Sequence, residues 1–443
     1  MSRMRVFIPE AGVWLSAACV SVCVLAMLGL IGILAVNGLT AFWPKPVESL
    51  RIEADGQRHD VLAQVLDQDG DVLILRSSEP VRIGESYQRV RLAQIVARSQ
   101  PADVVEIELN DGRLLFTRID IALLQNAIAA HASLLLSQDD PSHGITLDAN
   151  EIYRLRVANA DGYWQRFGEF ASQLWRFLST GPTSANPGGG ILPALVGTVM
   201  LVLLMSVLVM PLGVLAAVYL HEQAASSRRA RILRSAVNNL AGVPSIIYGL
   251  IGLALFVHQI GGSIDQLFYS ERLPTPTFGS GGLLWAALTL ALLTLPVVIV
   301  TAEEGLARVP QSLRDGSLAL GATRAETLWH LLLPLARPAL LTGLVLAIAR
   351  AAGEVAPLML VGVVKLAPAG VVDAQFPYLH PTREFMHLGY QVYDTALQGA
   401  DAWRAEPRAY ACALVLLLAV VALNLCAILL RNRLRARYRS LSY

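Results

Sequence analysis

The stretch that decides the fold is Arg314-Asp315-Gly316-Ser317-Leu318-Ala319-Leu320-Gly321-Ala322-Thr323-Arg324-Ala325-Glu326. Pro310 precedes it, and proline favours a helix start because its missing N–H would be unpaired there anyway. Gly321 is expected to end this first helix, since glycine readily adopts the left-handed backbone of helix C-termini. Thr323 and Glu326 have the spacing of a capping box, which starts a second helix. The stretch therefore predicts two short, structured helices.

The composition indicates that this structured stretch belongs to a membrane protein. Of the 443 residues, 54% are hydrophobic and 16% are charged, and the mean hydropathy is +0.52. Chains this apolar are typical of integral membrane proteins. The formal net charge of +1 gives no indication of nucleic-acid binding. The four cysteines lie inside apolar runs without metal-ligand or disulfide spacing, so we interpret them as small core residues and expect no metal site.

Six apolar stretches are long enough to cross a bilayer, which takes ~20 residues of helix. They lie at about 13–36, 191–219, 236–260, 281–301, 335–364 and 410–430. The first is longer than the apolar core of a typical cleaved signal sequence, which is the alternative, so we expect an uncleaved anchor. The sequence thus predicts an all-α polytopic membrane protein with six transmembrane helices.

The placement of arginine predicts the orientation of these helices. Four segments outside the apolar stretches are rich in arginine, and short segments of this kind face the cytoplasm. Their arginines are Arg3, Arg5, Arg228, Arg229, Arg231, Arg234, Arg308, Arg314, Arg324, Arg431, Arg433, Arg435, Arg437 and Arg439. Both termini and the stretch that begins at Arg314 are therefore expected in the cytoplasm.

This orientation gives the chain a predicted organisation in four parts. Residues 1–37 form the cytoplasmic N-terminus and the first transmembrane helix, and residues 38–190 form an extracytoplasmic domain with its linker. Residues 191–430 form the transmembrane core, which includes a cytoplasmic docking loop at 302–334. A basic cytoplasmic tail at 431–443 completes the chain.

The extracytoplasmic segment is expected to be an inserted α+β or β-rich domain. Residues 104–119 and 59–75 each alternate in the manner of a β-hairpin around a polar turn. A helical stretch near 121–136 and an amphipathic one near 163–178 follow. The aromatic residues of the last stretch either rest on the membrane interface or form the core of the domain. They are Trp164, Phe167, Phe170, Trp175 and Phe177.

Two charged residues, Arg350 and Glu354, lie within the fifth apolar stretch. Each charge costs at least ~2.5 kcal/mol in the middle of a membrane helix, so a compensating contact is required. Their i, i+4 spacing allows them to pair, and the small residues 351–353 allow a close neighbouring helix. The pair either fixes helix packing or, as we favour, forms an anion contact lining a translocation path. Pro357 predicts a kink in the same helix.

Together these segments resemble a known family of transport proteins. The opening stretch resembles the EAA loop of ABC importer permeases, with residues 315–317 in the Glu-Ala-Ala positions and Gly321 at the characteristic glycine. Residues 241–250 and 347–358 resemble phosphate permease subunits of the PstA type. The usual threonine of the family is Val355 here, so a hydroxyl is absent. The resemblance covers roughly residues 185–443 and does not extend to the external domain.

The resemblance implies a type I ABC importer permease fold in the bacterial inner membrane. It implies as partners a second phosphate permease subunit of the PstC type, an ATPase dimer of the PstB type, an extracytoplasmic phosphate-binding protein of the PstS type and membrane lipid, with no nucleic acid. It places Arg350 and Glu354 on the substrate pathway and the ATPase on the docking loop. The implied docking residues are Arg314, Asp315, Gly316, Ser317, Gly321, Ala322 and Thr323.

The chain itself is expected to hold neither an ATPase site nor any other catalytic residue. A phosphate-cradling Walker A loop needs Gly-Lys followed by Ser or Thr, and neither Lys45 nor Lys365 has that setting. We therefore expect no cofactor on this chain and ATP use by the partner subunit. Two alternatives stay open: a permease for another oxyanion such as sulfate or molybdate, and a membrane-anchored phosphate-sensing or signalling scaffold.

Overall fold

The computed structural model of the protein describes residues 7–54, 57–77, 87–110, 114–118, 133–136, 145–148, 151–159, 162–182, 189–223, 227–398 and 402–439. The chain divides into two compact units. The helical unit consists of Met1–Gly38 and Pro193–Tyr443, and the β unit consists of Leu39–Leu192.

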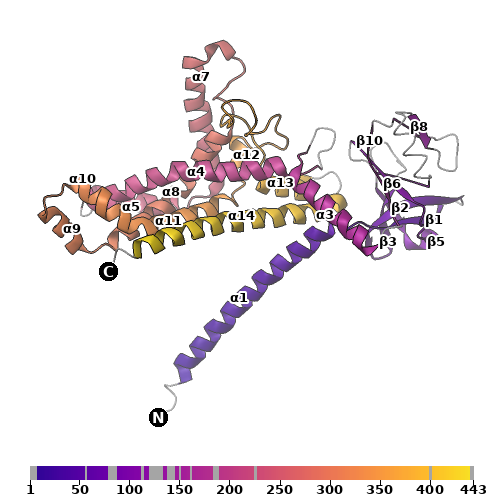
Figure 1. Cartoon of the computed structure of the whole chain (residues 1–443), viewed down its shortest axis with the longest axis horizontal. Helices are drawn as coiled ribbons and strands as arrows, with labels where there is room; N and C mark the ends of the chain where they lie inside the picture. The colour runs from indigo at the N-terminus through magenta and orange to yellow at the C-terminus, as the bar shows by residue number, and fades with distance from the viewer. Residues whose placement is uncertain are drawn as a thin grey trace. The chain divides into compact units, whose positions relative to one another are not determined.

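Six helices within the described residues are long and apolar enough to cross a membrane, as the sequence predicts. They are Gly12–Thr40, Leu192–Glu222, Ser245–Phe268, Leu283–Ala307, Arg324–Ala351 and Pro407–Arg433. Five of them coincide for most of their length with the long helices α1 (Phe7–Thr40), α4 (Leu192–Val218), α8 (Leu283–Ala307), α11 (Leu333–Ala351) and α14 (Ala402–Arg439). Four of these, α4, α8, α11 and α14, run side by side in the helical unit (Figure 1).

Helix α8 is the centre of this bundle, and its most apolar window is 67% buried. Small residues let α11 approach it closely. A Cβ at Gly343 of α11 would lie 2.2 Å from the Thr301 hydroxyl of α8, and one at Gly305 of α8 would lie 2.5 Å from Ala339 Cβ. Both glycines are therefore required by the helix contact, which holds α11 in register with α8.

The third span differs from its prediction at 236–260. An arginine-rich helix, α5 (Arg228–Leu240), ends within the predicted range, and a new helix, α6 (Ser245–Ile251), begins after Pro244. Proline excludes helical backbone at the residue before it and donates no hydrogen bond, so the helix breaks. The span then continues through the π-helix η5 (Gly252–Gly261) into α7 (Gly262–Phe268), which projects away from the side-by-side helices (Figure 1).

The fifth span also differs from its prediction at 335–364. It follows the π-helical turn η7 (Leu328–Leu332) as α11, and it ends at Ala351. A turn leads to Pro357, which is the N-cap of the short helix α12 (Leu358–Val361). The predicted kink at Pro357 is therefore wrong, because the proline starts a separate helix.

The β unit carries the predicted hairpins. One sheet has the order β4-β3-β2-β1-β5 and a second has the order β10-β6-β7, with every neighbouring pair antiparallel. Their strands are β1 (Val47–Ala54), β2 (Gln57–Asp69), β3 (Val72–Ser77), β4 (Tyr87–Arg91), β5 (Ile95–Ser99), β6 (Val105–Leu109), β7 (Leu114–Thr117) and β10 (Ile152–Val157). Alternate apolar side chains such as Leu50, Leu73 and Leu75 form the core of the first sheet.

One predicted element of this unit is partly wrong. Ser133–Leu136, the end of the predicted helix near 121–136, forms strand β8, which pairs with β9 (Ile145–Asp148). A short run of leucines is compatible with helix or strand, and here the pairing with β9 decides. Residues 121–132 lie outside the described residues. The amphipathic stretch near 163–178 forms helix α3 (Tyr163–Ser179).

Candidate functional site

The predicted helix pair is present at the end of α8. Helix α9 (Gln311–Ala319) follows Pro310, and α10 (Arg324–Thr327) follows Gly321, whose φ of +88° is left-handed. The capping box closes in both directions. The Thr323 N–H donates to Glu326 Oε2 at 2.8 Å, and the Glu326 N–H donates to Thr323 Oγ1 at 3.3 Å. The helix–turn–helix is therefore held by local hydrogen bonds, as the sequence predicts.

The residues predicted to dock an ATPase divide between two faces of this helix pair. Asp315, Gly316, Gly321 and Thr323 are exposed, and Ala322 is half-buried. Three leucines of the same segment are also exposed: Leu313, Leu318 and Leu320. The outer face thus offers apolar and polar groups together, which is the composition of a protein-binding surface.

The other two predicted docking residues, Arg314 and Ser317, face the protein. The Ser317 hydroxyl lies 2.9 Å from the hydroxyl of Thr327, which ties α9 to α10. Arg314 Nη1 forms an ion pair with Glu222 Oε1 at 2.8 Å. Its Nη2 donates to the Leu306 carbonyl oxygen at 2.9 Å and lies 3.1 Å from His221 Nε2.

These contacts connect α9 to two long helices. His221 and Glu222 lie on η4 (Tyr219–Gln223), the π-helical turn that ends the second span, and Leu306 lies in the last turn of α8. A second ion pair continues the connection, because Arg234 of α5 reaches Glu303 of α8 at 2.7 Å. Two of these contacts are charged hydrogen bonds, from Arg314 to the Leu306 carbonyl oxygen and from Arg234 to Glu303, and each is worth about 1.5–3 kcal/mol. These contacts join α9 to the turn that ends the second span and to the last turn of α8.

Sequence reasoning missed the carboxylates of this network. Arg234 was used to predict orientation and Arg314 to predict orientation and docking, while their partners Glu303 and Glu222 lie far from them along the chain. The available signal was the position of both glutamates at the end of an apolar stretch, beside arginine-rich segments. Charges at a span end need a partner or water, and this requirement marks them as candidates for pairing.

The predicted pathway pair lies where α11 ends. Arg350 is in the last turn of α11 and Glu354 is in the turn that follows, and the Arg350 Nε to Glu354 Oε1 distance is 3.7 Å. The side chains are 35% and 21% exposed. Arg350 Nε is shielded from solvent and has no hydrogen-bond acceptor among the described residues. The pair is thus an ion pair without a hydrogen bond, and the guanidinium keeps donors for a further anion.

The turn that carries this pair is packed against two neighbouring elements. Ala351 and Ala352 are fully buried, whereas a Cβ at Gly353 would meet nothing within 4 Å. Val355 packs on the first turn of α13 (Leu388–Tyr393), and Pro357 packs on α6. A Cβ at Gly249 of α6 would lie 2.6 Å from the Pro357 Cα, which fixes the turn against the third span.

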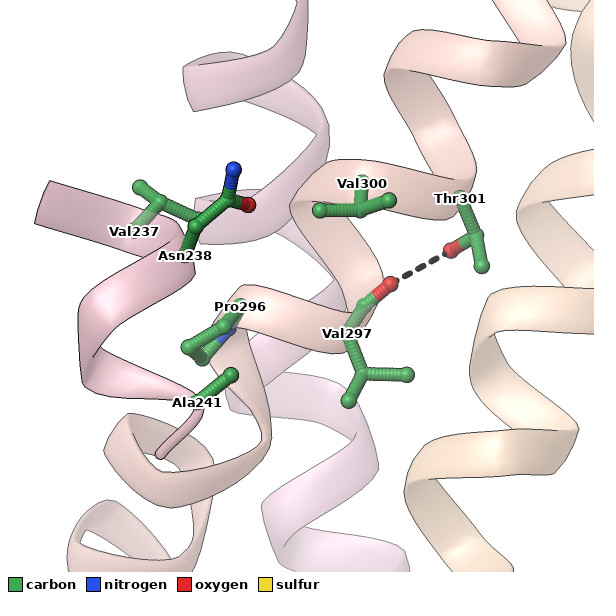
Figure 2. Close-up of a pocket in the computed structure, with 7 residues that line it drawn as sticks. All are labelled: Val237, Asn238, Ala241, Pro296, Val297, Val300 and Thr301. Atoms are coloured by element: carbon green, nitrogen blue, oxygen red, sulfur yellow. Dashed lines mark hydrogen bonds between the residues drawn. The ribbon is translucent and has the colours of Figure 1, made fainter. Parts of the chain in front are cut away.

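A pocket between α5 and α8 differs from the Arg350 site because no charged side chain lines it (Figure 2). It is lined by Val237, Asn238, Ala241, Pro296, Val297, Val300 and Thr301. The Thr301 hydroxyl donates to the Val297 carbonyl oxygen at 2.8 Å, so its donor is already used within α8 (Figure 2). The lining therefore offers no cationic group to an anion, and the pocket is separate from the Arg350 site.

Comparison with known proteins gives a family match within the helical unit. Residues 209–440 match the family of binding-protein-dependent transport system inner membrane components, which is just over half of the chain. The probable ABC transporter permease protein YqgH of Bacillus subtilis is 34% identical over 198 residues, which cover 44% of this chain and 60% of the relative.

Two further relatives carry a more specific name. The phosphate transport system permease protein PstA 1 of Mycobacterium tuberculosis is 35% identical over 212 residues, covering 48% of this chain and 63% of the relative. PstA of Yersinia pestis is 32% identical over 252 residues, covering 57% of this chain and 75% of the relative. The chain spans about three fifths of the length of YqgH and of PstA 1.

Proposed function

The chain belongs to the family of binding-protein-dependent transport system inner membrane components, and from that premise we propose that it is the permease subunit of an ATP-driven phosphate importer. The observation that carries the proposal is the incompletely paired Arg350 guanidinium at the break of a membrane helix. Two relatives are named phosphate transport system permease proteins, which supports the choice of cargo.

Arg350 is the group proposed to contact phosphate. A guanidinium presents planar, paired N–H donors that match the oxygens of a tetrahedral oxyanion, and it stays charged at every physiological pH. Glu354, at 3.7 Å, holds Arg350 while no anion is bound. When phosphate approaches, the carboxylate repels it and weakens its binding, so that the anion is released rather than trapped.

The exposed face of the α9–α10 pair is proposed to bind the ATPase in the cytoplasm. ATP is then bound and hydrolysed by the partner, and this chain needs no cofactor of its own. Closure of the ATPase would push α9 as a rigid body because the capping box and the Ser317–Thr327 contact hold the pair together. The Arg314 network would carry that movement to α4 and α8.

The remaining partners and the orientation follow from the same proposal. A second permease subunit would complete the translocation path, and a phosphate-binding protein would deliver the anion on the opposite side of the membrane. Both termini would face the cytoplasm, because the arginine-rich segments and the α9–α10 surface lie on that side. Residues 38–190 would then be extracytoplasmic.

Uptake of radiolabelled phosphate tests the proposal in cells that lack every other phosphate importer. Expression of this chain with its assembled complex should restore uptake that excess sulfate or molybdate does not compete away. Competition by either anion would overturn the cargo assignment. A crosslinker placed at the exposed residue Asp315 should in addition capture an ATPase subunit in the same membranes; failure to do so in an assembled complex would contradict the docking assignment.

A further inference from the structure

Helix α3 of the β unit binds its own domain through its polar face and exposes much of its aromatic face. Its polar face is joined to the sheet β10-β6-β7. Glu169 forms an ion pair with Arg154 of β10, and Arg176 forms one with Glu108 of β6 at 3.7 Å. The Arg176 guanidinium also lies over the ring of Tyr153, 5.8 Å from its centroid. The helix therefore contacts its own domain through charged side chains.

The opposite face of α3 is aromatic and points into open space. Its exposed side chains are Tyr163 at 68%, Trp164 at 81%, Phe167 at 48% and Trp175 at 70%. In a soluble domain an amphipathic helix turns its apolar side to the core. Here the charged side is bound to the sheet, and Trp164, Phe167 and Trp175 stay exposed on the other side. Phe170 and Phe177 contact the rings of Trp43 and Phe42 within the β unit. A cluster of four exposed aromatic side chains is typical of a surface that binds a membrane or another protein.

The two connections of the β unit to membrane helices meet at the C-terminal half of α3. The Ile191 N–H donates to the Phe177 carbonyl oxygen at 2.8 Å, and the Leu192 N–H, at the start of α4, donates to the Thr180 carbonyl oxygen at 3.0 Å. Helix α1 ends at Thr40. Two residues later, the centroid of the Phe42 ring lies 4.9 Å from that of the Phe177 ring. Within the β unit, the residue that follows α1 and the residues that lead into α4 are thus held against α3.

We propose that the aromatic face of α3 lies in the lipid headgroup region of the bilayer, as an in-plane interfacial helix. Tryptophan and tyrosine prefer this layer because the ring is apolar while its N–H or O–H stays hydrated. A 17-residue helix of this kind is about 25 Å long and buries its apolar side about 5–10 Å into the interface. The hydrogen bonds from Ile191 and Leu192 keep it at the level where the second span begins. The proposal does not depend on the cargo.

Spin labels on the full chain test this placement. The natural cysteines Cys19, Cys23, Cys412 and Cys426 are first replaced. A nitroxide is then attached at Trp164→Cys, at Trp175→Cys or, as the matched control on the polar side of the same helix, at Ser172→Cys. All three positions are exposed, so a label there leaves the fold intact. The protein is placed in nanodiscs of phosphatidylethanolamine and phosphatidylglycerol, and collision with oxygen and with a water-soluble nickel chelate is measured.

The three labels should respond differently. At 164 and 175 the ratio of oxygen to nickel accessibility should exceed that at 172 several-fold, because oxygen concentrates in lipid and the chelate stays in water. Equal, water-like accessibility at all three positions would overturn the proposal. Labels at 164 and 175 that neither reagent reaches would also overturn it, since they would show that another protein surface covers this face.

Discussion

Arg314 and Arg350 belong to the same helical unit, yet their guanidinium groups are paired very differently. Arg314 is 12% exposed and reaches Glu222, His221 and Leu306, all on other elements. Arg350 is 35% exposed, and within the described part of the chain its ion-pair partner is Glu354, four residues further along its own segment. A cation bound to several elements transmits movement between them, whereas a cation with one distant partner can accept a new anion. This difference is why we propose mechanical coupling for Arg314 and cargo contact for Arg350.

The largest expected effect comes from removing the charge of Arg350. Each hydrogen bond between this guanidinium and phosphate is worth about 1.5–3 kcal/mol, so Arg350→Gln should lower phosphate uptake by a factor of about ten or more. The amount of protein in the membrane should stay the same, because the variant removes no hydrogen bond of the described structure. Radiolabelled uptake with immunoblotting of membranes measures both quantities.

A matched substitution makes this prediction specific to position. Arg337 lies on the same helix α11, is exposed and is far from the turn after Ala351. Arg337→Gln should therefore leave uptake close to normal. Normal uptake in Arg350→Gln would remove Arg350 from the pathway, and an equal loss in both variants would indicate a general effect of charge on α11.

The second effect should come from the coupling side of the comparison. In Arg314→Glu the new carboxylate lies beside that of Glu222. Their repulsion should disconnect α9 from η4, the turn that follows α4. Loss of a partly buried pair costs about 1.5–3 kcal/mol, so we expect a several-fold loss of uptake with ATP hydrolysis that no longer depends on the binding protein.

Charge exchange tests whether the pair itself is responsible. The double variant Arg314→Glu with Glu222→Arg restores opposite charges at the 2.8 Å contact and should recover part of the uptake. Recovery should be incomplete because the Leu306 carbonyl oxygen loses its donor. A double variant no better than Arg314→Glu would show that the ion pair does not carry the coupling.

The smallest effect on uptake is expected from Asp373. This residue lies on the segment between α12 and α13 and is paired with Arg383 and His380. The hydrogen bond from Arg383, followed by that from the Gln375 N–H, lowers the pKa of Asp373 to about 2, from 3.8. A carboxyl with a lowered pKa stabilises this segment above pH 3.8, and the contribution is lost as the pH falls towards 2.

Hydrogen exchange at the Gln375 amide provides the measurement. At neutral pH, Asp373→Asn should exchange faster than the wild type at this amide, because the acceptor is no longer charged. The difference should shrink as the pH falls from about 4 to about 2, where the wild-type carboxyl also becomes neutral. Uptake at neutral pH should change less than in either arginine variant. A difference that persists at pH 2 would contradict the pairing.

Local signals allowed the docking helix pair to be predicted residue by residue. Gly321, Thr323 and Glu326 act on their immediate neighbours, so their spacing alone specifies the turn and the cap. The same holds for the hairpin of β6 and β7. The six spans were also predictable, because length and hydropathy suffice to recognise them.

Features that depend on distant contacts were not predictable. The apolar run through Val364 hid the end of α11 at Ala351, since a turn packed inside a protein is as apolar as a helix. The partner of Arg314 lies 92 positions away, and no local pattern connects them. For α3 the sequence left two interpretations of the aromatics, and our proposal of the interfacial one rests on the ion pairs on its polar face and on the exposure of Trp164 and Trp175.

The most direct test of the central claim measures phosphate uptake and ATP hydrolysis together in proteoliposomes that contain the assembled complex. Arg350→Gln should retain the bound ATPase and its hydrolysis while uptake falls to background. Arg314→Glu should retain part of the uptake but transport fewer phosphates per ATP than the wild type. If both variants lowered uptake and hydrolysis in the same proportion, the assignment of separate roles to the two arginines would be contradicted.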